Sequence, residues 1–214
     1  MKGAEKRMIN IQTIKIFSDE VFHFKMPNHE NWLEQIKQIV KVEDNSIHDF
    51  NTEPNDECNV KAKRTAWDSH LRYPAVANLT KELQKIISHL IESQNYDAPK
   101  IKVLDAWINW YKKNNFAVPH AHLPGHLSIV YFLDVEKSNA QFMFHKQSSF
   151  NLIKKDDKNN SFTNFAKVIN VKNGDVLMFP TSTMHSVSAN LTDNLRITYA
   201  SNMSVSYETE RNKY

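Results

Sequence analysis

Three histidines have the spacing of a metal site. His120 and His122 are two positions apart, and His185 lies on a later segment, just after an apolar strand and its turn. In an extended segment, side chains two apart leave the same face, so the pair can approach one ion together. Neutral imidazole suits iron among other metals, and ligands on one side leave positions open for substrate and oxygen. The alternative is that the pair lies in an exposed polar loop and His185 is a hydrogen-bonded core histidine.

A single arginine can supply the second half of such a site. In the last apolar run, Arg196, Thr198 and Asn202 alternate with apolar residues and so share one strand face. An inward-facing arginine needs a carboxylate partner, because burying an unpaired charge is costly. Guanidinium grips carboxylates through paired hydrogen bonds, so a dicarboxylic cosubstrate that chelates the metal at one end would find its other anchor here. The alternative is an internal ion pair with Asp134 or Asp175.

The elements that must position these side chains are strands. From residue 101 onward, short runs rich in β-branched and aromatic residues follow one another, separated by turn signals such as residues 172–175. Many short strands of this kind predict a mainly β fold with flanking helices, a double-stranded β-helix of the jelly-roll or cupin type, over about 101–206. The metal pair and the distal histidine would then lie on different strands of one barrel.

Two helices and edge strands are predicted before this β region. Apolar residues recur at helical spacing near residues 28–42, with Asn28 as a candidate N-cap, and again near 79–93. The segments INIQTIKIF and EVFHFKM alternate like strands at a sheet edge. Residues of about 1–100 would therefore supply helical support and edge strands to one domain covering 1–214.

Composition excludes several classes of protein. The 214 residues carry a formal net charge of +3, with lysines interspersed among acids, so no nucleic-acid partner is expected. Three glycines and no glycine-rich phosphate loop argue against nucleotide-dependent chemistry. The lone Cys58 can form neither an internal disulfide nor a cysteine zinc cluster. No segment has the apolar core of a signal peptide or of a membrane span, so a cytoplasmic protein is predicted.

The order of motifs along the chain resembles one family. From about residue 64 to 204 the chain has Trp107-x-Asn109, the histidine pair, a strand led by Ser128, an apolar strand ending Phe-Pro, then the distal histidine and the arginine. In this order the motifs resemble the 2-oxoglutarate/Fe(II)-dependent oxygenases common in bacteriophage and marine bacterial genomes. The resemblance implies a dioxygenase that hydroxylates an unidentified substrate, a small molecule or a protein side chain.

The resemblance also implies roles for individual residues. Fe(II) would be the metal and 2-oxoglutarate the cosubstrate, with the cosubstrate anchor flanked by polar residues that face the pocket. The implied metal ligands are His120, His122 and His185; the implied anchor is Arg196, with Thr198 beside it; and the implied pocket-facing residues are Tyr131 and Asn109.

One departure from the wider superfamily leaves alternatives open. The superfamily has Asp or Glu as its second ligand, where this chain has His122. Three neutral ligands leave a ferrous ion more positive and change its affinity and redox properties. His126 or His145 could replace one of the three as a ligand. Two other functions also remain: a three-histidine iron dioxygenase that does not use 2-oxoglutarate, and a non-catalytic jelly-roll binding or structural module.

The substrate is not indicated by any motif. Four aromatic residues of the β region could line a substrate pocket, although aromatic residues on strands more often belong to the core. These residues are Trp107, Trp110, Tyr111 and Phe116.

Overall fold

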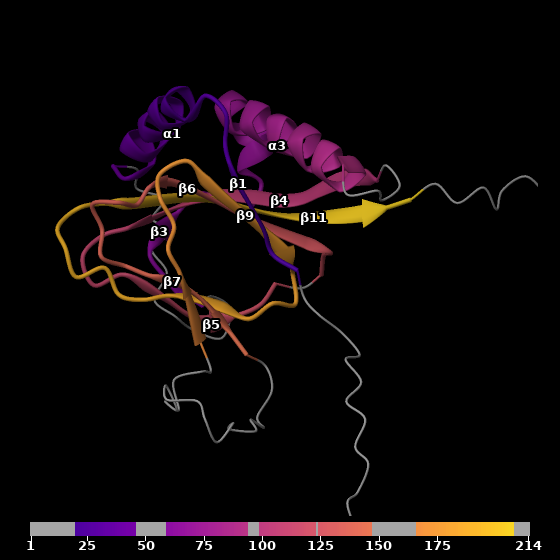
Figure 1. The fold of residues 1–214 in the computed structure, drawn as a ribbon. Helices are drawn as coiled ribbons and strands as arrows, with labels where there is room; N and C mark the ends of the chain where they lie inside the picture. Colours follow the sequence, from indigo (N-terminus) through magenta and orange to yellow (C-terminus); the bar gives the residue numbers. More distant parts are fainter. Residues whose placement is uncertain (1–19, 46–58, 94–98, 123, 147–165, 208–214) are drawn as a thin grey trace, which may run out of the picture.

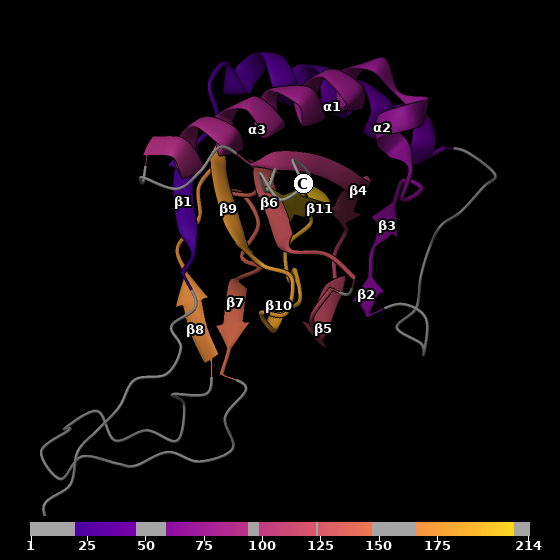
Figure 2. The same ribbon diagram turned by 90° about the vertical axis from the view of Figure 1, so that its right-hand side faces the viewer.

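Two antiparallel sheets face each other, and helices cover one of them (Figures 1 and 2). The computed structural model describes residues 20–45, 59–93, 99–122, 124–146 and 166–207. The segment INIQTIKIF and Cys58 lie outside these residues.

The larger sheet has six strands, and the smaller sheet has five. In spatial order, the larger sheet contains β1 (Phe22–Lys25), β9 (Asp175–Pro180), β6 (Leu127–Asp134), β11 (Arg196–Ser206), β4 (Lys100–Tyr111) and β3 (Lys63–Arg64). The smaller sheet contains β2 (Val60–Lys61), β5 (Phe116–His120), β10 (His185–Val187), β7 (Phe142–His145) and β8 (Ala166–Ile169).

The chain winds between the two sheets as a double-stranded β-helix. From β4 onward, β4, β6, β9 and β11 enter the larger sheet, while β5, β7, β8 and β10 enter the smaller one. Every strand pairing is antiparallel. This is the mainly β jelly roll with flanking helices that the sequence predicts, and the predicted edge strand in EVFHFKM is β1.

Helices α1 (His29–Glu43), α2 (Ser69–Arg72) and α3 (Pro74–Ser93) lie on the outer face of the larger sheet (Figure 2). The first helix matches its prediction within one residue, and Asn28 occupies the N-cap position without a side-chain capping bond. The third helix begins at Pro74, five residues earlier than predicted. Proline suits the first helical position, because the N–H that it lacks would have no partner there. Among the described residues, no helix is long and apolar enough to cross a membrane.

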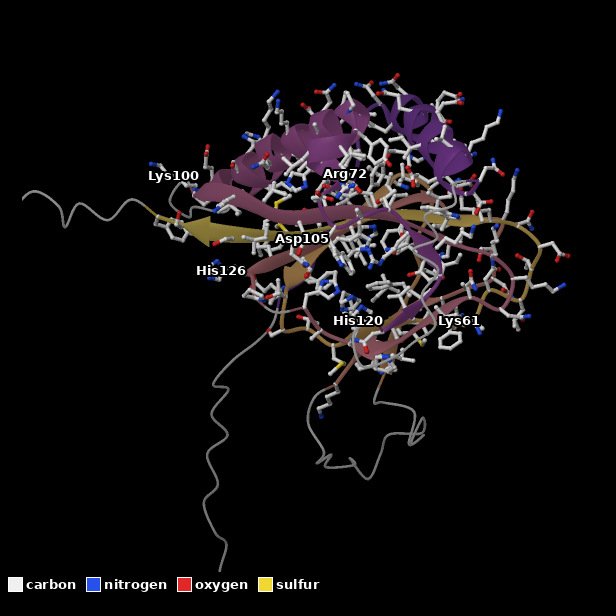
Figure 3. The ribbon with its side chains drawn as sticks, turned by 180° about the vertical axis from the view of Figure 1, so that it is seen from behind. Lys61, Arg72, Lys100, Asp105, His120 and His126 are labelled. Carbon is white, nitrogen blue, oxygen red and sulfur yellow. The ribbon has the colours of Figure 1, made fainter. Side chains whose placement is uncertain are left out.

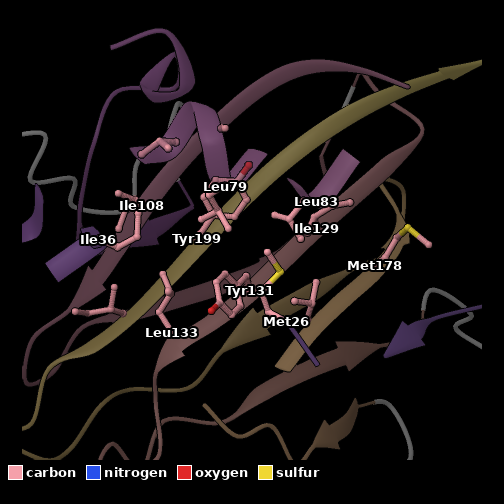
Figure 4. Close-up of a cluster of buried hydrophobic side chains, with 14 of the residues drawn as sticks. Met26, Ile36, Leu79, Leu83, Ile108, Ile129, Tyr131, Leu133, Met178 and Tyr199 are labelled. Atoms are coloured by element: carbon pink, nitrogen blue, oxygen red, sulfur yellow. The ribbon is translucent and has the colours of Figure 1, made fainter. Parts of the chain in front are cut away.

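Strand alternation divides the interior into two layers. Between the helices and the larger sheet, one face of α3 packs against side chains such as Ile129, Tyr131 and Tyr199 (Figure 4). Between the two sheets lies a second cluster that includes Phe132, Phe142 and Phe179. The helices thus cover the outer face of the larger sheet, and its inner face is left to form a site.

The short elements β2, β3 and α2 were not indicated by the sequence. Each of the two strands has two residues, and their pairings are Val60 with Ala117 and Lys63 with Trp110. Elements this short carry no periodicity of their own, because their hydrogen bonds come from the neighbouring strand.

Helix α3 is expected to stabilise the fold by burial. Leu83 is completely buried on its inner face, whereas Leu71 on α2 is 77% exposed. Leu83→Ala should therefore lower the free energy of unfolding by about 2–5 kcal/mol, through lost apolar burial and the cavity left behind. The matched Leu71→Ala should change it by less than about 0.5 kcal/mol. Urea unfolding of both variants is the measurement, and equal effects would contradict this packing.

Candidate active site

The pairing of β5 with β10 brings the three histidines together. His120 ends β5 and lies directly opposite His185, which begins β10. His122 follows two residues later, where its backbone N–H donates to the carbonyl of Thr181 at 2.8 Å. Each histidine offers one ring nitrogen, and these nitrogens lie within 4.8 Å of one another. The side chains thus form one cluster, not an exposed loop and a separate core histidine.

Hydrogen bonds at Nδ1 prepare two of the rings to bind a cation. The Nδ1 of His120 lies 2.7 Å from the carbonyl oxygen of Val118, and the Nδ1 of His185 lies 2.9 Å from that of Thr183. A carbonyl oxygen only accepts, so each Nδ1 carries the proton and donates it. The Nε2 lone pair of both rings is then available to a metal. Histidine metal ligands are commonly held by such a bond from the other ring nitrogen, so this donor set fits a metal.

Burial keeps the cluster neutral. Desolvation lowers the pKa of all three rings: that of His120 is lowered, that of His122 falls to about 4, and that of His185 lies well below 6.5. Electrostatic repulsion from the neighbouring histidines lowers the pKa of His122 and His185 further. Neutral imidazole is the form that binds metals, so the cluster is ready to bind at neutral pH.

The two alternative histidines lie apart from this cluster. His126 is exposed, and its Nδ1 accepts a hydrogen bond from the backbone N–H of Val205 at 2.8 Å. The Nε2 of His145 lies 2.7 Å from the hydroxyl of Ser186. Neither belongs to the group of ring nitrogens that could hold an ion.

Arg196 is buried with most of its hydrogen-bonding capacity unused. Its side chain is 1% exposed, and its Nη1 donates to the carbonyl of Ala140 at 3.2 Å. Its Nε and Nη2 are buried without a hydrogen-bond partner in the described part of the chain. Desolvation lowers its pKa to about 10, which still leaves the guanidinium charged at neutral pH. An unpaired buried cation of this kind can bind an anion.

The predicted alternative of an internal ion pair at Arg196 is wrong. Asp134 pairs with Lys37 at 2.7 Å, and Asp175 pairs with Lys25 at 2.8 Å. Both carboxylates therefore bind lysines, and Arg196 has no acidic partner among the residues that the structure describes.

A cavity of about 430 Å³ between the sheets joins the histidines to the arginine. Its walls include the three histidines, Arg196 and Thr198, and the inward residues of β4. Those inward residues are Asp105, Trp107, Asn109 and Tyr111. A cavity of this size is typical of a site for small molecules.

Comparison with known proteins finds a family model that is similar to part of the chain. Residues 105–202 match the model of the family Putative 2OG-Fe(II) oxygenase. The match covers just under half of the 214 residues, and it agrees with the family that the sequence motifs resemble. The match runs from the inward residues of β4 to Asn202 and includes the histidine cluster and Arg196. A comparison with curated proteins finds no match.

Solved 2-oxoglutarate oxygenases share the fold. The non-heme alpha-ketoglutarate-dependent epimerase SnoN from nogalamycin biosynthesis aligns at a TM-score of 0.64 and 13% identity, covering 89% of this chain and 79% of SnoN. A Pseudomonas putida prolyl-4-hydroxylase aligns at 0.59 and 8% identity, covering 87% and 93%. HygX from Streptomyces hygroscopicus, solved with nickel and 2-oxoglutarate bound, aligns at 0.60 and 13% identity, covering 89% and 84%. At these identities the likeness establishes the fold.

The structure places three of the four residues predicted around the cosubstrate at the cavity. Arg196, Thr198 and Asn109 all line the cavity, and Thr198 is paired directly with Asn109 across β11 and β4. The buried Oδ1 of Asn109 has no hydrogen-bond partner in the described residues, so it too is available to a ligand.

The predicted position of Tyr131 is wrong. Its hydroxyl lies 2.7 Å from the Nδ1 of His29 on α1, in the layer between the larger sheet and the helices. Its neighbours Val130 and Phe132 line the cavity, so alternation along β6 turns Tyr131 to the other face. The resemblance identified the strand without fixing the face of this one residue.

The four aromatic residues divide in the same way. Trp107 and Tyr111 line the cavity, while Trp110 faces the helices and donates through Nε1 to Asp44 at 2.9 Å. Phe116 is half-buried outside the cavity lining.

Sequence reasoning placed Asn202 on the inward face without giving it a role. Its Oδ1 lies 2.8 Å from the Nδ1 of His122 and accepts a hydrogen bond from the hydroxyl of Ser128 at 2.8 Å. An amide oxygen only accepts, so His122 carries its proton on Nδ1 and, like the other two rings, leaves Nε2 unprotonated. The position of Asn202 in the same alternating set as Arg196 was the available signal.

The metal-free protein is expected to lose stability between pH 7.5 and pH 5. A histidine whose pKa is lowered by folding binds fewer protons in the folded than in the unfolded state, so its contribution is lost as pH falls below 6.5. His122, with a folded pKa of about 4, alone contributes at most about 3 kcal/mol. Urea unfolding in the presence of a chelator measures this change.

A matched pair of variants assigns that change to the cluster. His122→Asn removes one titrating ring and should flatten the pH dependence. His89→Asn, on the exposed face of α3, should keep the parental slope. A parental slope in His122→Asn would contradict the assignment.

Asn202→Ala is expected to weaken metal binding about 10- to 100-fold, because loss of a bond that orients a ligand typically has an effect of this size. The fold should be retained. Competition with a chromophoric chelator measures the affinity. Asn139→Ala, which makes the same chemical change at an exposed residue, is the control. Equal affinities in the two variants would show that Asn202 does not orient His122.

Proposed function

We propose that this protein is a 2-oxoglutarate- and Fe(II)-dependent dioxygenase. The observation that carries the proposal is one cavity that combines three neutral histidines with an unpaired, buried guanidinium. His120, His122 and His185 would hold the iron, and Arg196 would bind the distal carboxylate of 2-oxoglutarate. When bound, iron and 2-oxoglutarate together activate dioxygen to oxidise a substrate C–H bond, with succinate and carbon dioxide as co-products.

The chain itself supplies binding, orientation and exclusion of water. Thr198 lies beside the arginine and its hydroxyl can donate a further hydrogen bond to a carboxylate, whereas the free Oδ1 of Asn109 can accept one from another part of a ligand. The aromatic cluster of Phe132, Phe142 and Phe179 encloses the inner end of the space between the sheets and limits the access of water. HygX, which has the same fold, was solved with nickel and 2-oxoglutarate bound, and this supports both assignments by analogy.

A three-histidine iron dioxygenase without 2-oxoglutarate is the second candidate, because the ligand set contains no carboxylate. Arg196 favours the first candidate, since 2-oxoglutarate brings a distal carboxylate for the buried guanidinium, whereas the second candidate would need a substrate with a carboxylate of its own. The third hypothesis is a non-catalytic jelly-roll module. It explains neither why three neutral histidines cluster in the cavity nor why Arg196 is buried there without an acidic partner.

Three finer assignments belong to the same proposal. Hydroxylation is the expected outcome, on a small molecule or a protein side chain. The bacteriophage and marine bacterial kinship rests on the resemblance of motifs. A cytoplasmic setting is proposed because a single cysteine is typical of a protein from a reducing compartment.

Arg196→Met should weaken 2-oxoglutarate binding by about 2–5 kcal/mol, the usual cost of truncating one partner of a buried charged pair. Metal binding should persist, because no ligand is lost. His185→Ala should instead abolish binding of both. Anaerobic titration of the ferrous protein, followed by the metal-to-ligand absorbance band, measures each binding step.

The matched ligand is 2-oxobutyrate, which keeps the keto acid but lacks the distal carboxylate. The parent should strongly prefer 2-oxoglutarate, and Arg196→Met should bind the two keto acids about equally. If Arg196→Met keeps the parental preference, Arg196 is not the anchor and the second candidate function moves ahead.

A further inference from the structure

We infer that the outer part of the cavity binds an organic cation of the substrate, an ammonium or guanidinium group, with Asp105 as its charge partner and the indole of Trp107 as its wall. This inference rests on the proposed function, because it concerns the substrate side of the same site.

Asp105 is the only acidic residue in the described lining of the cavity. It is half-buried and extends from the larger sheet into the space opposite His120 on the smaller sheet (Figure 3). Its Oδ1 accepts the backbone N–H of Asn202 at 3.0 Å, but among described residues no lysine or arginine pairs with it. Burial raises the pKa of Asp105, and hydrogen bonds from the backbone and side chain of Asn202, together with an electrostatic interaction with His70, oppose this effect.

The two charges of the cavity lie at opposite ends of it. Along the paired strands β4 and β11, Asp105 is opposite Asn202, and Arg196 is opposite Tyr111. Six residue steps separate these pairs, which is roughly 20 Å along a strand. His122 contacts Asn202, so the candidate metal lies near the Asp105 end. A 2-oxoglutarate held by Arg196 would therefore leave Asp105 facing the substrate.

Aromatic rings form the wall beside Asp105. Trp107 is two residues further along the same face of β4, and its ring centroid lies 5.7 Å from that of His122. Trp67, which is 44% exposed, meets Trp107 edge to face at 4.6 Å. The guanidinium carbon of Arg64 lies 3.8 Å from the ring centroid of Trp67, so Trp67 already has a cation over its ring. We therefore assign the contact with the ligand to Trp107. An indole attracts organic cations through its π face, and a carboxylate beside it adds the charge.

Asp105 also contributes to the pairing of β4 with β11, and the test must distinguish this structural role from recognition of a cation. The register between β4 and β11 shifts just after Asn202, and the carboxylate accepts a backbone N–H at this bulge. Asp105→Asn keeps an acceptor oxygen and the size of the side chain but removes the charge. A structural role would survive this substitution, whereas recognition of a cation would not.

The test uses the full-length protein loaded with Fe(II) and 2-oxoglutarate under anaerobic conditions, with binding measured by calorimetry. The probes are an acetylated Gly-Lys-Gly amide, its Gly-norleucine-Gly counterpart, and spermidine. We expect the parent to bind at least one cationic probe at least tenfold more tightly than the norleucine peptide. Asp105→Asn should abolish this preference without changing the unfolding midpoint, and Glu136→Gln, which neutralises an exposed acid, should retain it.

Each outcome decides something. Preference for the lysine peptide supports a protein side chain as the source of the cation, and preference for spermidine supports a small polyamine. No preference in the parent, or an unchanged preference in Asp105→Asn, overturns the inference. The parent's 2-oxoglutarate binding is measured in the same samples, so its absence would count against the proposed function, and its presence without cation preference would count against the substrate class alone.

Discussion

The antiparallel pairing of β5 with β10 is the constraint on which the candidate site depends. It sets His120 opposite His185 although 65 positions separate them in the chain. Side chains alternate along a strand, so a one-residue shift in the register between β5 and β10 would turn one of these rings to the other face of the sheet. The three ring nitrogens would then no longer lie close together. The hydrogen bonds that hold each ring then fix which nitrogen carries the proton. Register and tautomer together turn three ordinary histidines into a set of ligands.

The cavity contains regions that differ in charge: a neutral histidine cluster, the cationic Arg196 at one end and the acidic Asp105 at the other. The histidines are neutral because burial disfavours their charged form, whereas Arg196 stays charged because its ordinary pKa is so high. A buried cation without a partner is costly, so the position of Arg196 favours binding of an anion beside it. Asp105, at the other end, accepts hydrogen bonds from Asn202 but has no lysine or arginine partner among the described residues. The cavity is thus suited to ligands that bring the missing charges with them.

The two faces of the larger sheet have different roles: the outer face packs against the helices in an apolar core, and the inner face carries the side chains of the candidate site. Helices α1 and α3 cover the outer face of the larger sheet and bury an apolar cluster that includes Leu83 and Tyr199 (Figure 4). The inner face of the same strands can therefore carry polar side chains such as Thr198 and Asn202. Alternation along a strand makes this division possible, because neighbouring residues serve different layers. The prediction that Tyr131 faces the cavity was wrong for this reason: adjacent residues of β6 face opposite sides of the sheet, and Tyr131 faces the apolar core.

The sequence by itself determined the class of fold, the resemblance to one family, and which residues of β11 face inward. The patterns that carried these predictions involve residues close together in the sequence, so they can be recognised without the tertiary structure. They are the strand-like runs, the two helical stripes, the spacing of His120 and His122, and the alternation of Arg196 with apolar neighbours. Only the tertiary structure decided that Arg196 lacks an acidic partner, that Asn202 orients His122, and that Asp105 faces the cavity. Each of these facts depends on which strands pair and in what register, and that is set by the packing of segments far apart in the chain.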